Sequence, residues 1–268
     1  MKPYQNFSNE HLKYLKKEKN RQIQIWIFRF AILAFILLSW ELLALFGLID
    51  TFILSSPSKI FKTLANLFVN DNMLFHIGIT LYETIVGFIV AVLLGTVIAL
   101  LLWLSEFAQK VIEPYLVVLN SLPKIALGPI IIVAFGSGSK SIIFMAVLIG
   151  IIVTIINMLS GFLSTDKGKI QLLKTMGANK FQLLTKLVLP SSLKTFISTL
   201  KVDVGMAWIG SIMGEYIASK AGLGYLLVYG AQVFKLDLVM ATIVVLCVLA
   251  SLMYLSILIL EKVLIKNY

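Results

Sequence analysis

A few ionisable and aromatic side chains interrupt the apolar stretches of this sequence, and they are the first candidates for chemistry. Glu83, Asp203 and Glu215 each have long aliphatic runs on both sides, and Trp208 lies between the last two. A buried carboxyl group is costly to desolvate, so it is kept for ion or proton transfer, for a solute pathway, or for a satisfied hydrogen bond. We take Asp203, Trp208 and Glu215 as candidates for a pathway or a gate. For Asp203 a structural hydrogen bond is an equal alternative, and for Glu215 a purely structural role remains open.

Residues that catalyse reactions or hold metals do not gather at any point of the sequence. His11 and His76 are isolated from other ligand types, and Cys247 is the only cysteine. The G-x-S-x-G and H-E-x-x-H motifs are missing, and residues 136–141 lack the spacing of a phosphate-binding loop. We therefore expect no catalytic residue, no metal site, and no ATP or other cofactor bound by this chain.

The composition explains which elements must position these side chains. Apolar residues make up 59% of the 268 positions and charged residues only 13%, so a water-soluble fold could not bury the apolar excess. The net charge of +10 comes from short segments between apolar runs, without a basic stripe interleaved with aromatic residues. The expected surroundings are a lipid bilayer, and no nucleic acid is expected as a partner.

Six apolar stretches are long enough to cross a bilayer as helices, at residues 26–48, 77–104, 112–135, 141–162, 193–217 and 238–260. The third stretch contains Pro114, Pro123 and Pro129, so it must be broken or kinked. The sequence thus predicts an all-α membrane protein of about six transmembrane helices, with residues 25–268 as a single transmembrane domain.

The distribution of charge predicts the orientation of these helices. Most Lys and Arg residues lie in the basic leader 1–24, in the loop 163–195 and near the C-terminus. The positive-inside rule then places both termini and this loop in the cytoplasm. The leader is either a short helix on the inner membrane surface, with Tyr4, Phe7, Leu12 and Leu15 at helical spacing, or a frayed tail. A second amphipathic helix is expected on the outer surface after Pro57.

The loop 163–195 has the pattern of two short helices joined by a glycine. Apolar residues follow a helical period before and after Gly177, which suits the left-handed geometry that ends a helix, and Pro190 is expected to close the segment. Such a pair of helices either docks into a groove on another protein or packs beneath its own bundle. The apolar positions are Leu172, Leu173, Met176, Phe181, Leu184, Leu187 and Val188.

Small residues are expected to let helices approach closely in the stretch 193–217. Gly210 and Gly214 are four residues apart, and Gly205 lies one and a half turns before them. This spacing is typical of close contact between membrane helices. A second copy of the chain is one neighbour that could use it.

Two segments carry a resemblance to a known family. Gly177, followed after nine residues by Leu187, Val188, Leu189 and Pro190, resembles the spacing in the cytoplasmic loop of permease subunits of binding-protein-dependent ABC importers. Residues 205–227, with Glu215 and the run from Gly222 to Tyr225, resemble the nitrate, sulfonate and taurine branch of these permeases. Shorter motifs fall in the same order upstream, and the resemblance covers about residues 54–260. The usual Glu-Ala-Ala at the start of the loop motif is replaced by Gln171, Leu172 and Leu173.

This resemblance implies a type I importer architecture in a bacterial plasma membrane. It implies a homodimer that forms the pathway, cytoplasmic ATPase subunits that hold ATP and Mg²⁺, and an extracytoplasmic binding protein that delivers a small solute. A sulfonate, taurine, nitrate or a vitamin-precursor pyrimidine would be such a solute. The residues that it implies in ATPase coupling are Gln171, Leu172, Leu173, Met176, Gly177, Ala178, Phe181, Leu187, Leu189 and Pro190.

Two other functions fit the same residues. An ion-coupled carrier could use Asp203, Glu83 or Lys201 as its ion or proton site. A membrane scaffold could use the loop 163–195 to recruit a soluble protein without transporting anything.

Overall fold

The computed structural model describes residues 9–70 and 72–265, and the contacts divide the chain between Thr63 and Leu64. The first unit contains α1 (Asn9–Leu45), α2 (Thr51–Leu54) and the start of α3 (Pro57–Asn70). The described part of the leader and residues 26–45 of the first apolar stretch form the single helix α1. Tyr4 and Phe7 lie outside the described residues, as does the side chain of Leu12.

Glu41 joins two elements of the first unit. Its carboxylate accepts hydrogen bonds from the backbone amide of Ser58, at 3.1 Å, and from the Ser58 hydroxyl. These bonds satisfy an amide in the first turn of α3, which has no partner within its own helix. A polar residue within the first apolar stretch therefore has a capping role.

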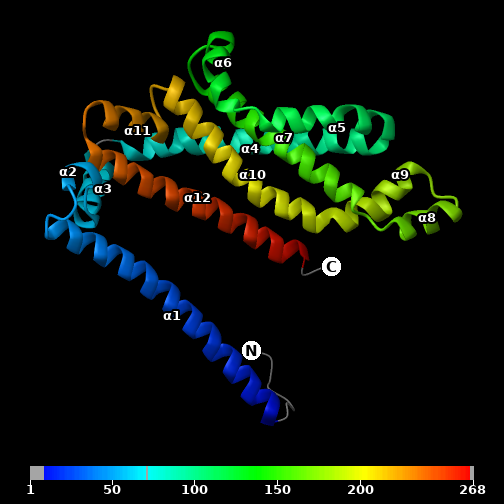
Figure 1. Ribbon diagram of the computed structural model, residues 1–268, viewed down its shortest axis with the longest axis horizontal. Coiled ribbons are helices and arrows are strands. Elements are labelled where there is room, and N and C mark those ends of the chain that lie inside the picture. The colour runs from blue at the N-terminus through cyan, green and yellow to red at the C-terminus, as the bar shows by residue number, and fades with distance from the viewer. Residues whose placement is uncertain (1–8, 71, 266–268) are drawn as a thin grey trace. The chain divides into compact units, whose positions relative to one another are not determined.

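The second unit is built of helices throughout its described residues (Figure 1). Its elements, in chain order after α3, are α4 (Met73–Leu104), α5 (Glu106–Ser121), η1 (Lys124–Leu127), α6 (Gly128–Phe135), α7 (Ser139–Leu163), α8 (Lys167–Thr175), α9 (Lys180–Leu183), η2 (Leu184–Val188), α10 (Leu189–Ala218), α11 (Leu223–Gln232) and α12 (Leu236–Ile265). Within this unit, α8 and α9 lie at one end of α7 and α10, and α6 and α11 lie at the other.

Five helices in the described residues are long and apolar enough to cross a membrane. The third predicted stretch is a pair of helices, Glu106–Ser121 and Lys124–Phe135, bent by 83°. Counted as one broken span, this pair brings the number to six, as the sequence predicts. The break falls at Leu122 and Pro123, whereas Pro114 lies inside α5 and Pro129 lies in the first turn of α6.

The helix α7 lies between α4 and α10 and forms the centre of the second unit. Small residues allow the close approach on both sides. A Cβ atom at Gly95 of α4 would lie 2.6 Å from the Cβ of Thr154, and one at Gly161 of α7 would lie 2.7 Å from a methyl group of Thr195. Real Cβ contacts are not this short, so the three helices pack at distances that only glycine permits at these points.

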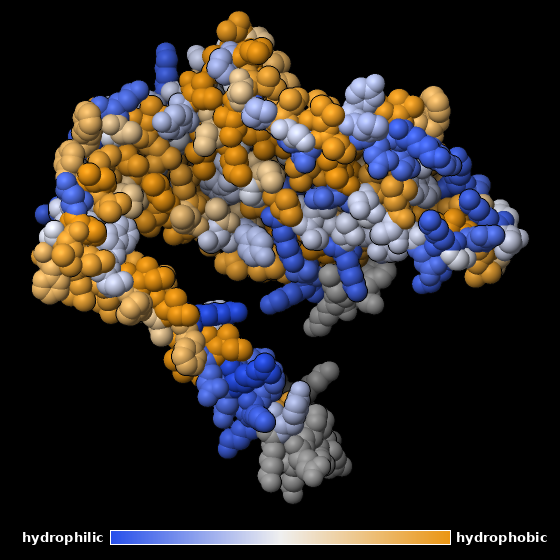
Figure 2. Space-filling view, in the orientation of Figure 1, coloured by the Kyte–Doolittle hydropathy of each residue, from blue (hydrophilic) through white to orange (hydrophobic). Residues whose placement is uncertain are grey.

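Hydrophilic side chains gather at one end of the second unit (Figure 2). Apolar side chains cover much of the helical surface in the same view, whereas the end with α8 and α9 is hydrophilic. This distribution matches a helical bundle that is embedded in lipid with a polar loop outside it. The cations of that end include Lys167, Lys169, Lys174, Lys180 and Lys186.

Candidate functional site

The loop between α7 and α10 folds into two short helices around Gly177. The carboxylate of Asp166 caps α8 by accepting from the Gly168 amide at 2.7 Å. Gly177 has φ of +83°, and its amide donates to the Lys174 carbonyl at 3.0 Å. This left-handed residue satisfies carbonyls at the end of α8 and turns the chain, at a position where a Cβ atom would be strained.

A capping box starts the second short helix. The Gln182 amide donates to Asn179 Oδ1 at 2.8 Å, and the Asn179 amide donates to Gln182 Oε1 at 2.9 Å. Both groups would otherwise be unpaired amides at a helix start. The turn around Gly177 is therefore fixed on both sides by local hydrogen bonds.

The prediction that Pro190 closes this segment is wrong. Pro190 lies in the first turn of α10, and the chain stays helical from Lys180 to Ala218. The π-type turn Leu184–Val188 joins α9 to α10, and the Leu189 amide donates to the Leu184 carbonyl five residues earlier. Such a turn changes the hydrogen-bond register just before the proline, which has no amide hydrogen to donate.

Exposed apolar side chains lie on both sides of the turn at Gly177, whereas the buried ones of this loop begin at Leu183. Leu172, Met176 and Phe181 are 61%, 74% and 69% exposed, and we call them the docking triad. In contrast, Leu183, Leu184 and Val188 are buried; we call these three residues the anchor. Leu184 and Val188 belong to the core cluster formed by Ala99, Leu102, Leu116, Ile155, Met158, Leu159 and Phe162.

The remaining loop residues singled out in the sequence lie between these two surfaces. Gln171 and Leu189 are exposed, whereas Leu173, Ala178, Leu187 and Pro190 are half-buried. The predicted apolar stripe is thus divided: Phe181 faces outward, whereas Leu184 and Val188 face their own bundle. Packing beneath the bundle and an exposed apolar surface occur together in one loop.

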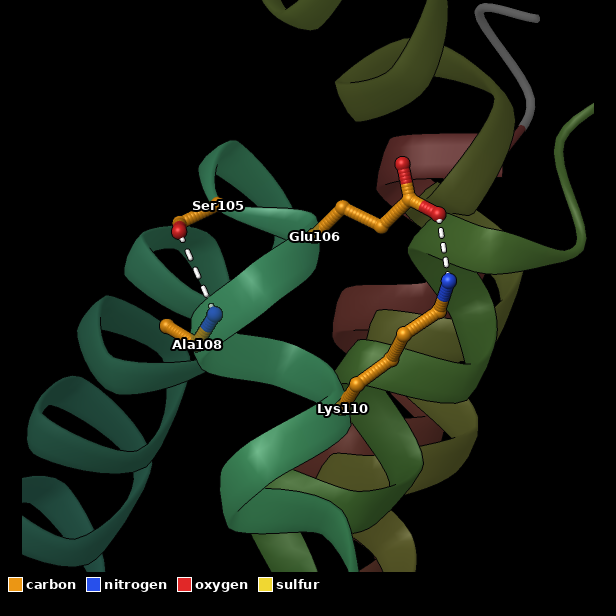
Figure 3. Close-up of polar contacts among 4 residues, drawn as sticks. All are labelled: Ser105, Glu106, Ala108 and Lys110. Carbon is orange, nitrogen blue, oxygen red and sulfur yellow. Dashed lines mark hydrogen bonds and ion pairs between the residues drawn. The ribbon is translucent and has the colours of Figure 1, made fainter.

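The turn between α4 and α5 is joined to α9 by a hydrogen bond. Figure 3 shows the polar contacts of its residues. Ser105 caps α5 by accepting from the Ala108 amide at 3.2 Å, and Glu106 and Lys110 form an ion pair of 2.8 Å on one face of that helix. Lys180 Nζ donates to the Leu104 carbonyl at 3.2 Å and so connects the start of α9 to the end of α4. A groove of about 420 Å³ runs along this junction, lined in part by Trp103, Gln109, Lys174 and Leu183.

Asp203 is buried between α10 and α7. Its Oδ2 accepts a hydrogen bond of 2.8 Å from the hydroxyl of Thr154, whose oxygen also lies 3.1 Å from the Gly150 carbonyl. Oδ1 of Asp203 and Nε1 of Trp208 have no partner among the described residues. Both side chains are at most 5% exposed, so in this conformation neither reaches the surface of the chain.

Lys201 has a partner on another helix. Its Nζ atom lies 2.8 Å from Glu261 on α12, with both side chains about a quarter to a third exposed. Sequence spacing could not reveal this pair, because the two residues are sixty positions apart. The ion pair provides the charge of Lys201 with a partner inside the same chain.

Glu215 lies in a polar cluster where α10, α4 and α11 meet. Its Oε2 accepts from the Gly224 amide at 2.6 Å, and its side chain also reaches Thr80 and Glu83 on α4. The Leu223 amide donates to Thr80 Oγ1 at 2.8 Å. These contacts hold the start of α11 against the two long helices.

His76 completes this cluster on the α4 side. Its Nδ1 accepts from the Gly222 amide at 3.0 Å, and its ring stacks on Tyr225. A Cβ atom at Gly222 would overlap the Glu215 carboxylate, and one at Gly224 would lie 2.7 Å from Glu215 Cβ. The sequence analysis names Glu83 and His76 separately, but no sequence pattern predicts that they lie beside Glu215.

The glycines of α10 differ in what they approach. Gly210 and Gly214 both pack against α7 of the same chain, where a Cβ at Gly214 would lie 3.0 Å from the Ile142 Cα. Gly205 has nothing within 4 Å of the position of a Cβ atom. The neighbour of the first two glycines is therefore α7, and only Gly205 faces open space. Within the described residues, no group of three His, Cys, Asp or Glu side chains could hold a metal ion.

Relatives of known description match most of the chain. A protein of Haemophilus influenzae described as an ABC transporter permease is 32% identical over 227 residues, which are 84% of this chain and 91% of that protein. The formylaminopyrimidine transport permease ThiX of Halalkalibacterium halodurans is 32% identical over 63% of this chain and 68% of its own. The aliphatic sulfonates permease SsuC of Bacillus subtilis is 25% identical over 94% and 91%.

A solved structure shares the fold. The inward-facing MetNI methionine ABC transporter, in its CY5 native crystal form, contains a chain that superposes with a TM-score of 0.65 at 17% identity. The superposition covers 72% of this chain and 98% of that one.

A family model spans two thirds of the sequence. Residues 91–267 match the binding-protein-dependent transport system inner membrane component. The matched part contains α7, the loop with the docking triad, and α10 with its polar side chains. The chain therefore belongs to this family of inner membrane components, and it is a multi-pass permease subunit of an ABC importer rather than an enzyme.

Proposed function

We propose that this permease subunit couples to a cytoplasmic ATPase through the docking triad. The main observation is that Leu172, Met176 and Phe181 are exposed, whereas the turn that follows α9 is anchored in the core by Leu184 and Val188. Large apolar side chains on a polar, Lys-rich surface are typical of sites that another protein covers. The groove along Trp103 and Lys180 extends this surface toward α4.

Movement of the loop would reach the membrane through α10. The anchor residues belong to α9 and η2, which continue into α10 without an interruption of the helix. A displacement imposed on α8 and α9 would therefore tilt or rotate α10 as a body, together with Asp203, Trp208 and Glu215. This link would let ATP-driven closure of the partner subunits alternate the pathway between its two openings.

ATP and Mg²⁺ belong to the partner ATPase in this proposal, and this chain binds neither. Energy from hydrolysis would enter only as a mechanical displacement of the loop. The ATPase would face the end of the bundle that carries α8 and α9, so both termini and this end would be cytoplasmic in a bacterial plasma membrane. The cationic side chains of this end agree with that orientation.

A second copy of the chain would complete the pathway. In the second half of α10, one face is apolar and exposed, with Val202, Gly205, Ile209 and Tyr216 at helical spacing. An open glycine in such a stripe allows another helix to approach closely. We infer that this face meets its counterpart in a homodimer.

The solute would be small and would be delivered by an extracytoplasmic binding protein. The relatives are described by their transport of formylaminopyrimidine and aliphatic sulfonates, so these two classes, with taurine and nitrate, form the first panel of solutes to test. Uptake into proteoliposomes that contain the permease, its ATPase and its binding protein would identify the solute.

Replacing Gly177 tests the proposed coupling. Gly177→Trp places a large side chain on a left-handed residue between the two short helices, so we expect loss of ATP-driven uptake while the membrane fold persists. Gly47→Trp is the matched control, because Gly47 also has a positive φ, of +69°, and open space around it. Uptake and ATPase assembly would be measured for both variants.

Three outcomes would contradict the proposal. Normal uptake by Gly177→Trp would exclude the loop as the coupling element. Uptake without any ATPase that collapses with the proton gradient would instead indicate an ion-coupled carrier. Undiminished uptake of every solute in cells that lack this chain would leave only a scaffold role.

A further inference from the structure

Two buried carboxyl groups face each other where α4, α10 and α11 meet. Glu83 and Glu215 are each 1% exposed, and their side chains lie within hydrogen-bond reach of one another. Oε2 of Glu83 and Oε1 of Glu215 have no hydrogen-bond donor among the described residues. Two carboxylates cannot approach in this way without repulsion, and each of these oxygens lacks a hydrogen.

The surroundings supply hydrogen-bond donors but not a cation. The described groups that lie against the two carboxyls are Thr80 on α4, Ser139 on α7 and the Gly224 amide on α11. The neighbouring His76 accepts from the Gly222 amide through Nδ1, so this nitrogen has no proton and the ring is neutral. A net charge of −2 would therefore have no compensating charge in this cluster.

We propose that Glu83 and Glu215 hold one proton between them. The carboxylic acid O–H of one residue would donate to the carboxylate of the other, which gives a hydrogen to the one contact that lacks it. The Gly224 amide occupies Oε2 of Glu215 at 2.6 Å, so the shared proton lies between the two unpartnered oxygens, Oε1 of Glu215 and Oε2 of Glu83. The pair then has a net charge of −1, and the proton lies where a bound cation would otherwise compensate the second charge.

This proton has a positioning role. With it, Glu215 is hydrogen-bonded to both Glu83 and the Gly224 amide, and the segment 219–225 is fixed to α4 and α10 at once. Without it, the two carboxylates would separate, and the glycines packed against Glu215 would lose their support. The proton is a part of the fold and is not carried across the membrane, so this inference is independent of the solute and of the ATPase.

Infrared spectroscopy of the full chain in lipid nanodiscs tests the shared proton. At neutral pH we expect a protonated carboxylic acid band that shifts in D₂O. In Glu83→Gln the band disappears, because the amide now donates to Glu215 and the remaining carboxyl is ionised. Glu215→Gln should remove it by the same reasoning. Asp203→Asn is the matched control, since it removes another buried carboxyl from α10 and should leave this band unchanged.

The outcomes distinguish one shared proton from two protons and from a bound metal cation. A band that stays at half intensity in each Gln variant would show two protons and overturn the proposal. If neither substitution removes a carboxylic acid band, the proposal is overturned as well. In that case, a thermal midpoint that rises with Na⁺ would identify a metal cation in place of the proton.

Hydrogen exchange gives a second readout of the positioning role. Glu83→Leu removes the partner of Glu215, so amides at 222–226 should exchange roughly tenfold faster, in line with the loss of a hydrogen bond to a charged group. Glu83→Gln and Asp203→Asn should keep the protection of the native chain. Equal exchange in Glu83→Leu and Glu83→Gln would exclude the positioning role.

Discussion

Asp203 depends on a single side-chain donor, the hydroxyl of Thr154 on the neighbouring helix. The sequence left two roles open for Asp203, and the structure shows a hydrogen bond across α7 and α10 with one carboxylate oxygen unpaired. Residue type and spacing predict that a buried carboxyl needs a partner. They cannot name the partner, because Thr154 is forty-nine positions away.

Removing this donor should destabilise the second unit. Thr154→Val keeps the shape of the side chain but leaves Asp203 without its donor, so we expect a loss of about 1–3 kcal/mol in the free energy of unfolding. Thr199→Val is the control, because Thr199 is equally buried and donates only to the Thr195 carbonyl of its own helix. Chemical denaturation in detergent would measure both. A larger effect at Thr199 would contradict this reading of Asp203.

A second prediction at the residue scale concerns the close packing at Gly210. Gly210→Ala would push a methyl group into the Ala146 backbone, so we expect destabilisation of about 1–3 kcal/mol. Gly78→Ala, on α4 with nothing within 4 Å, should be neutral or stabilising because alanine favours the helix. Thermal unfolding of the purified chain would compare them, and equal midpoints would refute the close packing of α10 on α7.

At the scale of elements, hydropathy located the membrane helices but not their full extent. The stretches 77–104, 141–162, 193–217 and 238–260 correspond to α4, α7, α10 and α12, each of which begins a few residues earlier. The helix α1 begins well before residue 26, because charged residues of the leader are good helix formers that a hydropathy scan cannot detect. The helix α11 was missed because its ten residues are too short for a span.

The two surfaces of the loop should respond differently to truncation. Leu184→Ala creates a cavity in the core cluster and should cost about 2–5 kcal/mol of folding stability. Leu172→Ala removes an exposed side chain and should change stability by less than about 0.5 kcal/mol, while it weakens binding of the ATPase. Thermal unfolding together with a pull-down of the ATPase separates the two effects. Loss of stability in both variants would mean that the docking triad is part of the core.

At the scale of the whole molecule, the sequence predicts the helical membrane fold but not the division of the chain into two units. Composition and six apolar stretches are enough to predict a helical membrane protein, and the order of motifs predicts the family. The division between Thr63 and Leu64 has no counterpart in the sequence, because it depends on which contacts form rather than on which residues are apolar.

This division predicts that the second unit folds without α1. A chain that begins at residue 50 should insert into the membrane and unfold at the same temperature as the full chain, since the contacts among residues 64–265 remain. Circular dichroism during heating would measure the transition, and only the start of α3 should lose order, because Glu41 no longer caps it. A markedly lower midpoint for the shortened chain would show that the first unit supports the second.

The unbroken helical path from α9 through η2 to α10 has a consequence for measurement. At about 1.5 Å per residue, the thirty residues of α10 form a rod of roughly 45 Å. Spin labels at its two ends should report one fixed separation throughout the transport cycle, whereas labels on α10 and α12 should report several. The same helix can therefore serve as an internal ruler against which every other displacement in the assembly is calibrated.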